Sequence, residues 1–351
     1  MRKLIAVVGL TVSAGLVTLP ALPTVHAAPR AAAPAMLTSL SIMVGGLAKQ
    51  IYLPSELSQQ LGFFKKEGLN VTLIDEPSGQ SSEDATIAGQ VQAGSGAYQH
   101  TIELQTLGKG LETVVQLGIA PGEAEMVATK EAGTVKSFKD LRGKNLGVTE
   151  LGSGTHALSK YLLIKAGVPE TAVHFIPVGA ADTFIAAMQQ GTIDAGMTTE
   201  PTISRLLSTG EGKVLVDLRT PKTTRKALGT DFPFISVFMS TSYVNSHKSV
   251  VQHVVNAYVR TLHWIHTHTA TQIANKLPAD YYAGNKGLYV SALKAQQAMF
   301  SPTGLMPKAG PATVLKLERA TNTQVGTNAV NLSKTYTNAY VAKAMQLLHI
   351  K

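Results

Sequence analysis

Two short segments of the chain share a pattern that strongly constrains its fold. Residues 87–95 read IAGQVQAGS, and residues 189–197 read QQGTIDAGM. In both segments a glycine separates a helical pattern from a short apolar run, which is typical of a helix that ends just before a strand. The match predicts two similar α/β lobes in tandem; a chance likeness between two common turns is the alternative. At a constant offset of 102 residues, Gly89, Val91, Ala93 and Gly94 match Gly191, Ile193, Ala195 and Gly196.

The wider pattern alternates strands and helices in two blocks. In the first block we expect strands at 40–44, 69–74, 91–98 and 113–119, with helices at 53–64, 81–88 and 101–107. In the second block we expect strands at 145–149, 173–177, 193–197 and 213–218, with helices at 155–166, 182–190 and 201–209. Strands that alternate with helices form mostly parallel sheets covered on both faces, so the chain is predicted to be an α/β protein.

The pattern changes after Phe234. One more apolar strand is expected at 234–241, and helices follow at 246–266, 288–299, 309–321 and 333–348. We expect this tail to pack back on the first lobe, so that crossings near 126–132 and 231–237 form a hinge between the lobes. The predicted domains are therefore 37–128 for the first part of lobe 1, 129–233 for lobe 2, and 234–351 for the rest of lobe 1 with the helical tail.

The N-terminal residues have the composition of a secretory signal peptide. Arg2 and Lys3 precede an apolar run over 4–19, and small residues follow around Ala27 and Ala28. An uncleaved membrane anchor is the alternative, but the run is short for a span. We predict a signal peptide over 1–27, a flexible leader over 28–36, and a mature protein in the periplasm or outside the cell.

Cysteine content and charge narrow the function further. The chain has no cysteine, which excludes disulfides, thiolate metal sites and a lipid-modified cysteine anchor. Its formal charge of +9 becomes +7 without residues 1–27, because Arg2 and Lys3 are lost and no acid is. This balance attracts small anions, but no dense run of Lys and Arg indicates a nucleic-acid partner.

Three segments in order resemble one family of binding proteins. They are LGFFKKEGLNVTLI at 61–74, VKSFKDLRGKNLGV at 135–148 and MQQGTIDAGMTTEP at 188–201. They are similar to segments of the substrate-binding proteins of ABC importers in the nitrate/sulfonate/taurine group, also called NMT1/THI5-like. The resemblance implies a type II periplasmic-binding-protein fold, in which two α/β lobes surround a ligand cleft, two hinge crossings join them and a helical C-terminal tail follows.

The resemblance also implies where the ligand binds. Ligands of open α/β sheets bind beyond the carboxyl ends of the strands, where helices begin. The alternative for Lys49 is a side chain exposed to solvent. The alternative for Tyr52 and Tyr98 is that they pack as half-buried aromatic residues. In the first lobe the family's ligand contacts correspond to Lys49, Gln50, Tyr52, Ser78, Gly79, Tyr98 and Gln99. In the second lobe the expected residues are Gly152, Ser153, Gly154, Thr155, Ala180, Thr199 and Glu200.

The second lobe and the tail also contain segments that partly resemble a nucleophile loop, a P-loop and a metal site. The hydroxyls of Ser153 and Thr155 suit the oxygens of a sulfonate, carboxylate or phosphate, or they only cap the following helix. Leu151 stands where a GxSxG nucleophile loop needs glycine, and the Gly-Lys-Ser/Thr ending of a P-loop is missing. The HWIHTH segment at 263–268 has no acid nearby and is interpreted as a helix end, not a metal site.

The sequence therefore predicts a monomeric receptor that performs no bond chemistry and needs no cofactor. It binds a small organic anion or zwitterion, such as a sulfonate or taurine, and delivers it to the membrane permease of an ABC importer. A THI5-like pyrimidine-precursor binding protein or synthase is the alternative, although the resemblance implies that those enzymes are intracellular and have a cysteine-rich motif. A secreted hydrolase that uses Ser153 is a more distant alternative.

Overall fold

The structure is a computed structural model that describes residues 6, 9–11, 37–282 and 284–350. Apart from residues 6 and 9–11, the expected signal peptide over 1–27 and leader over 28–36 lie outside the described residues. The described residues from Leu37 onward belong to one compact unit. Among the described residues, no helix has both the length and the apolar character that crossing a membrane requires.

The first lobe is built on a five-stranded sheet with the order β2-β1-β3-β10-β4. Strand β1 runs parallel to β2 and β3, whereas β10 runs antiparallel to β3 and β4. The strands are β1 (Thr38–Val44), β2 (Leu69–Asp75), β3 (Ala93–Ala97), β4 (Leu111–Gln116) and β10 (Ile235–Ser240). The helices of this part are α1 (Leu53–Gln60), α2 (Phe63–Lys66), α3 (Gly79–Ile87) and α4 (Gln99–Thr106).

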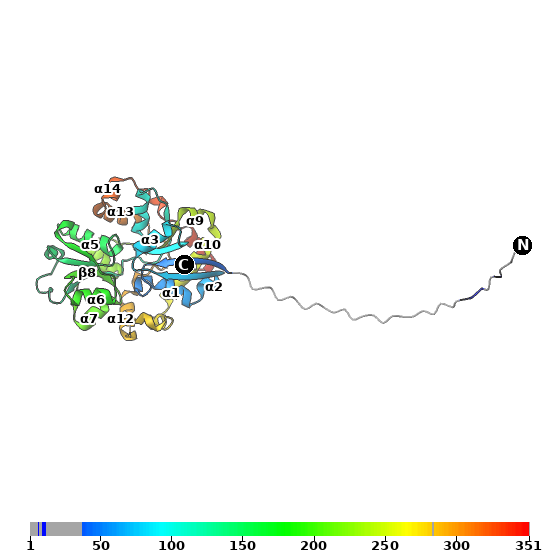
Figure 1. Cartoon of the computed structure of the whole chain (residues 1–351), viewed down its shortest axis with the longest axis horizontal. Helices are drawn as coiled ribbons and strands as arrows, with labels where there is room; N and C mark the ends of the chain where they lie inside the picture. Colours follow the sequence, from blue (N-terminus) through cyan, green and yellow to red (C-terminus); the bar gives the residue numbers. More distant parts are fainter. Residues whose placement is uncertain (1–5, 7–8, 12–36, 283, 351) are drawn as a thin grey trace. The chain divides into compact units, whose positions relative to one another are not determined.

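The second lobe repeats this arrangement with the order β7-β6-β8-β5-β9. Its β6 is parallel to β7 and β8, and β5 is antiparallel to β8 and β9. The strands are β5 (Glu123–Ala128), β6 (Asn145–Val148), β7 (His174–Pro177), β8 (Ala195–Thr199) and β9 (Gly212–Leu218). The helices are α5 (Gly154–Lys165), α6 (Asp182–Gln189), α7 (Thr202–Thr209) and α8 (Pro221–Leu228), green in Figure 1. The two sheets confirm the predicted α/β class with two lobes.

The first crossing between the lobes lies earlier than expected. Strand β5 belongs to the second sheet, so the chain leaves the first sheet over residues 117–122 and not near 126–132. The lobe boundary expected at 128 is wrong for the same reason. The segment EAEMVA was not recognised as a strand because its glutamates suggest exposure, yet Glu123 and Glu125 are both buried. The return crossing follows α8 and runs beside the first, where Phe234 N donates to Gly118 O at 2.9 Å.

The helical tail contacts both lobes, not the first lobe alone. The long helix α10 (Lys248–Thr267) packs on α1, α2 and β4 of the first lobe, as expected. However, α12 (Lys286–Gln296) contacts α7 and α13 (Gly310–Thr321) contacts α5, both in the second lobe. Helical periodicity shows that one face is buried but not against which element. The other tail helices are α9 (Thr241–Ser246), α11 (Ala270–Ala274), α14 (Thr323–Thr327) and α15 (Ala339–Leu348).

The repeated glycines occupy equivalent places in the two lobes. Gly89 follows α3 with φ +73°, and Gly191 follows α6 with φ +76°, a left-handed conformation that glycine adopts without a steric cost. Gly94 and Gly196 instead allow close packing within the central strands β3 and β8. A Cβ on Gly94 would lie 2.4 Å from Phe238 Cε2, and one on Gly196 would lie 2.5 Å from the carbonyl oxygen of Gly147.

We predict that Gly196→Ala destabilises the fold. The added methyl group would press on the backbone of β6, which cannot yield as a flexible side chain can, and overpacking of this kind costs about 1–3 kcal/mol. Urea unfolding followed by circular dichroism measures the loss. Gly133→Ala is the matched control because a Cβ there meets nothing within 4 Å. Equal unfolding midpoints for the two variants would contradict the role of Gly196.

Candidate functional site

The carboxyl ends of the parallel strands of both lobes surround a small closed space, here called the central cavity. Its volume is about 20 Å³, which is room for about one water molecule. A larger ligand therefore enters only if the lobes or their side chains move apart. The first lobe contributes Lys49, Ile51, Tyr52, Gly79, Ala97 and His100; the second contributes Glu123, Thr149, Ser153, Gly154, Thr155 and Thr199; and Phe234 and Ile235 complete the lining.

Two larger pockets lie beside the central cavity. The outer pocket has a volume of about 650 Å³ and shares Lys49 with the cavity. Its other walls include Asp75 and Pro77 of the first lobe and Ala180 and Arg205 of the second. The side pocket measures about 380 Å³ and is lined by residues of both lobes, including Gln99, Glu103, Gly152, His156, Lys160 and Glu318.

The first turn of α5 forms the second-lobe wall of the central cavity. Ser153 is the N-cap of this helix: its Oγ accepts a bond from His156 N and donates to Glu150 O at 2.6 Å. Thr155 Oγ1 accepts a bond from Thr149 N at 3.0 Å. Both hydroxyls thus organise the loop while they line the cavity, so a helix cap and a ligand contact are compatible here.

Two cationic groups stand on the first-lobe wall. Lys49 is half-buried, and its Nζ donates to Gly45 O at 2.7 Å and to Pro77 O at 2.6 Å. Burial lowers the pKa of Lys49 to about 8, against the attraction of Glu123, Asp75 and Glu150. The ammonium group therefore keeps its proton at neutral pH.

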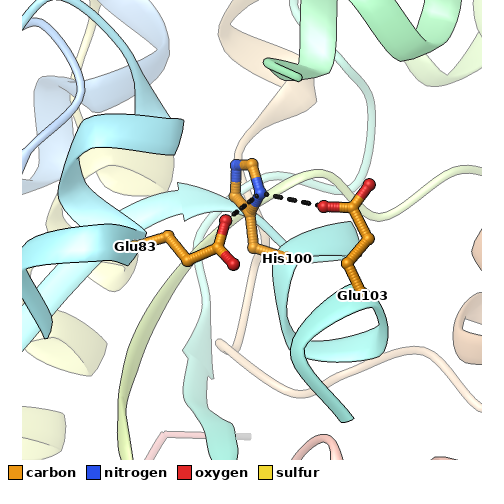
Figure 2. A group of neighbouring side chains, drawn as sticks. All are labelled: Glu83, His100 and Glu103. Atoms are coloured by element: carbon orange, nitrogen blue, oxygen red, sulfur yellow. Dashed lines mark ion pairs between the residues drawn. The ribbon is translucent and has the colours of Figure 1, made fainter. Parts of the chain in front are cut away.

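His100 is the second cation and is fully buried. Its Nδ1 lies 2.8 Å from Glu83 Oε2 and 3.4 Å from Glu103 Oε2 (Figure 2). Burial of the ring opposes the charge, but the two carboxylates outweigh it and raise the pKa of His100 to about 10. Its Nε2 lacks a hydrogen-bond partner within the described residues and lies 3.2 Å from the position of a Cβ on Gly79. The protonated ring thus offers an N–H group at the cavity wall.

Glu123 gives the cavity an acid as well. It is buried, and one of its carboxylate oxygens has no hydrogen-bond donor in the described part of the chain. Burial raises the pKa of Glu123 well above its usual range, although Lys49 opposes the shift. A cavity with two cations, one acid and several hydroxyls is complementary to a small molecule that carries both charges.

Two contacts join the lobes across the cleft. The hydroxyls of Ser78 and Ser81, at the start of α3, donate to Glu150 Oε2, and the bond from Ser81 measures 3.2 Å. The backbone N–H of Gln50 donates to Glu200 O at 3.0 Å. Ser78 was expected to contact the ligand, but here its hydroxyl is engaged by a carboxylate of the opposite lobe.

Two of the expected contact residues point to structural partners instead. The Gln50 amide donates to Tyr289 O at 3.0 Å and accepts a bond from Gln296 at 2.8 Å, both in the tail. The Tyr98 hydroxyl meets Thr335 Oγ1 at 2.5 Å. These expectations were wrong in orientation: strand-end loops also face the tail helices, and a sequence does not show which face a side chain takes.

Glu200 is likewise a structural residue. Its carboxylate is fully buried, pairs with Arg219 Nη1 at 2.9 Å and accepts a bond from Ser204 N at 2.9 Å. This corrects its expected role as a ligand contact. The structure brings Lys49, Tyr52, Gly79, Ser153, Gly154, Thr155 and Thr199 to the central cavity, places Ala180 in the outer pocket, and places Gln99 and Gly152 in the side pocket.

Three charged residues at the cleft, His100, Glu150 and Glu123, were not among the expected ligand contacts. His100 directly follows Gln99 in a loop that was already considered, so its position offered a signal. Glu150 immediately follows the strand that leads to Ser153, and this position was a weaker signal in the sequence. No signal in the sequence pointed to Glu123, because strand β5, on which it lies, was not predicted.

The chain forms two α/β lobes, and each sheet contains one strand, β10 or β5, that follows a crossing between the lobes. This arrangement defines the periplasmic-binding-protein fold, as the resemblance implied. A solved periplasmic aliphatic sulphonate-binding protein from Escherichia coli shares this fold, with a TM-score of 0.64, 20% identity, and coverage of 86% of this chain and 99% of that one. Residues 53–271 match the family described as NMT1/THI5 like, so the chain belongs to that family.

Individual relatives carry two different kinds of name. A solved protein from Bordetella bronchiseptica RB50 is 32% identical, with a TM-score of 0.85 and coverage of 89% of this chain and 98% of its own. A putative aliphatic sulfonates-binding protein from Escherichia coli (strain K12) is 30% identical over 149 residues, 42% of this chain and 45% of that protein. A 4-amino-5-hydroxymethyl-2-methylpyrimidine phosphate synthase from Uromyces fabae is 28% identical over 164 residues, 46% of each chain. The chain thus matches less than half the length of these curated relatives.

We predict that Arg219→Met destabilises the second lobe. The substitution leaves the buried Glu200 carboxylate without its cation, and breaking a buried pair in this way costs about 3 kcal/mol. Arg225→Met is the control, because Arg225 pairs with Asp231 on the surface and such pairs contribute less than about 1 kcal/mol. Thermal unfolding of both variants tests the difference, and similar losses would refute the structural role of Glu200.

Proposed function

We propose that this chain is an extracytoplasmic solute-binding receptor of an ABC importer. The observation that carries the proposal is the central cavity, whose walls come from both lobes and hold Lys49, His100 and Glu123. A site divided between two lobes binds its ligand by hinge closure, because each lobe supplies only half of the contacts. The name of the Escherichia coli sulfonate-binding relative supports the same function.

The charges of the cavity indicate the class of ligand. His100 and Lys49 suit an anionic group, and Ser153 and Thr155 add hydroxyls beside the start of α5. Glu123 has a carboxyl oxygen without a donor in the described part of the chain, and a cationic group at the other end of the ligand would pair with it and favour its ionised form despite its burial. We therefore favour a small zwitterion such as taurine, or an alkanesulfonate, over a bare inorganic anion.

The crossings and the Glu150 contact give closure a physical basis. The two crossings lie side by side and form the hinge, while Ser78, Ser81 and Glu150 meet only when the lobes are together. In the proposed cycle the signal peptide directs export, the monomeric receptor closes on its ligand, and the closed form docks on the membrane permease. Opening of the cleft at the permease then releases the ligand.

The second candidate function is that of a synthase, as the Uromyces fabae relative is named. That relative matches only part of this chain, and the resemblance implies a cysteine-rich motif that a chain without cysteine does not have. Incubation of the protein with a cell extract, followed by mass spectrometry, would detect formation of 4-amino-5-hydroxymethyl-2-methylpyrimidine phosphate, the compound in that relative's name. Formation of that product would replace the receptor function with the enzymatic one.

We predict that taurine or an alkanesulfonate stabilises the purified protein. A ligand at 100 times its dissociation constant adds about 2.7 kcal/mol to the free energy of unfolding. Thermal unfolding with taurine, butanesulfonate, nitrate, sulfate and 4-amino-5-hydroxymethyl-2-methylpyrimidine measures the effect. Stabilisation by the pyrimidine alone would favour a precursor-binding protein, and stabilisation by nitrate alone would contradict the inferred zwitterion.

We predict that Lys49 makes the affinity for taurine depend on pH. Below pH 8 the ammonium group is charged and attracts the sulfonate, whereas above pH 8 it loses its proton and the affinity falls. Lys49→Met should weaken binding at pH 7 by about tenfold, which is 1.4 kcal/mol, and remove this fall. Calorimetric titration at pH 6–9 tests the expectation, with the exposed Lys109→Met as control. Unchanged affinity in Lys49→Met would exclude a ligand contact.

A further inference from the structure

A histidine and two glutamates converge behind the central cavity. Glu83 comes from α3, and His100 and Glu103 come from the first two turns of α4 (Figure 2). One ligand atom from each residue lies within 4.8 Å of the other two. Glu83 and His100 are buried, and Glu103 is 18% exposed.

The three ligand atoms lie close enough together for one metal ion to bind all of them. A tetrahedral ion with bonds of about 2.1 Å holds its ligand atoms about 3.4 Å apart. His100 Nδ1 lies 3.4 Å from Glu103 Oε2 and 2.8 Å from Glu83 Oε2. At 2.8 Å the His100 ring and the Glu83 carboxylate form an ion pair in this structure, so a metal ion that binds both groups must displace the proton on Nδ1.

A third carboxylate provides an independent indication. Glu318, on α13, is 1% exposed, and neither of its oxygens has a hydrogen-bond donor in the described part of the chain. It faces Glu103, and burial together with Glu103 raises the pKa of Glu318 well above its usual range. Glu103 Oε1 accepts bonds from Gln99 and Asn322, but Glu318 has no donor among the described residues, so the two facing carboxyl groups require either a shared proton or a cation between them.

The charges around the cluster leave a deficit of positive charge. The His100 imidazole is the single basic group of the cluster. Three acids lie around it, Glu83, Glu103 and Glu318, and Asp84 adds a further acid nearby. Lys160 also faces the group, but its ammonium pairs with Glu170 at 2.9 Å, and burial together with Lys160 lowers the pKa of the nearby His156 to about 4, so that its ring is neutral. A bound divalent ion would balance this excess of buried acids.

The side pocket supplies a route for the ion. Glu103 and Glu318 both line this pocket of about 380 Å³, whereas His100 and Glu83 lie behind them. An ion that enters from solvent would meet the two carboxylates first and then the imidazole. A site of this kind needs an entry path as well as ligands, and the cluster has both.

We propose that Glu83, His100 and Glu103 form a binding site for a divalent transition-metal ion, with Glu318 beside Glu103 as a further acid at its entrance. One imidazole nitrogen with two or three carboxylate oxygens suits Zn²⁺ or Mn²⁺ rather than Mg²⁺ or Ca²⁺, which prefer oxygen alone. The site shares His100 with the wall of the central cavity, but Glu83 and Glu103 lie outside that lining, and binding of the ion can be measured without any transport ligand. Coordination through Nδ1 leaves a proton on Nε2, the nitrogen near the cavity.

The first test measures binding of Zn²⁺ to the chelator-treated full chain. We expect one Zn²⁺ per chain by calorimetry and elemental analysis, and at least about tenfold weaker binding in Glu103→Gln. His174→Asn and Glu112→Gln control for adventitious binding, because these residues lie outside the cluster. Absence of stoichiometric binding, or equal weakening by the control variants, would overturn the proposal. Tighter binding of Mg²⁺ than of Zn²⁺ would also contradict it.

The second test needs no substitution and so does not depend on whether a variant folds. Nitrogen NMR of the histidine rings in the wild-type chain reports which ring nitrogen binds Zn²⁺. We expect one histidine to change to a form ligated at Nδ1 and protonated at Nε2, and to release about one proton per Zn²⁺ at pH 7. If all histidine signals stay unchanged at saturating Zn²⁺, the acids of the cluster are balanced by protons and the proposal fails.

Discussion

Each sheet of this protein is completed by a strand that the chain supplies only after it has crossed between the lobes. Strand β10 enters the first sheet between β3 and β4, and β5 enters the second between β8 and β9. Both strands run antiparallel to their neighbours, so the remaining strands keep their carboxyl ends at the cleft. The paired crossings therefore fix which edges of the two sheets face each other, and with them the position of the central cavity.

The cleft that results is a charged surface that is largely removed from water. His100 keeps its proton because Glu83 and Glu103 stand behind it, and Lys49 keeps its proton at neutral pH despite its burial. Isolated buried charges are costly, so each of these groups depends on a partner from another segment of the chain. The same principle explains Glu200 and Arg219, whose buried ion pair holds the loop after β8 in place.

Much of the framework was predictable from local patterns. The repeat around Gly89 and Gly191 reflects a physical requirement, because both glycines adopt left-handed conformations after equivalent helices. The loop at Ser153 was also identified correctly as a helix start beside the cleft. The orientation of Gln50 and Tyr98 was not predictable, since their partners Tyr289 and Thr335 are more than 200 residues away in the sequence.

The sequence by itself determined the alternation of strands and helices, the two-lobed class and the loops that reach the cleft, because periodicity, glycines and caps act over a few residues. Only the tertiary structure decided where β5 lies, which loop residues face the cavity, and that Glu83, His100, Glu103 and Glu318 meet. The physical reason is that these facts depend on contacts between distant segments. Burial and charge pairing have no local pattern from which they can be read.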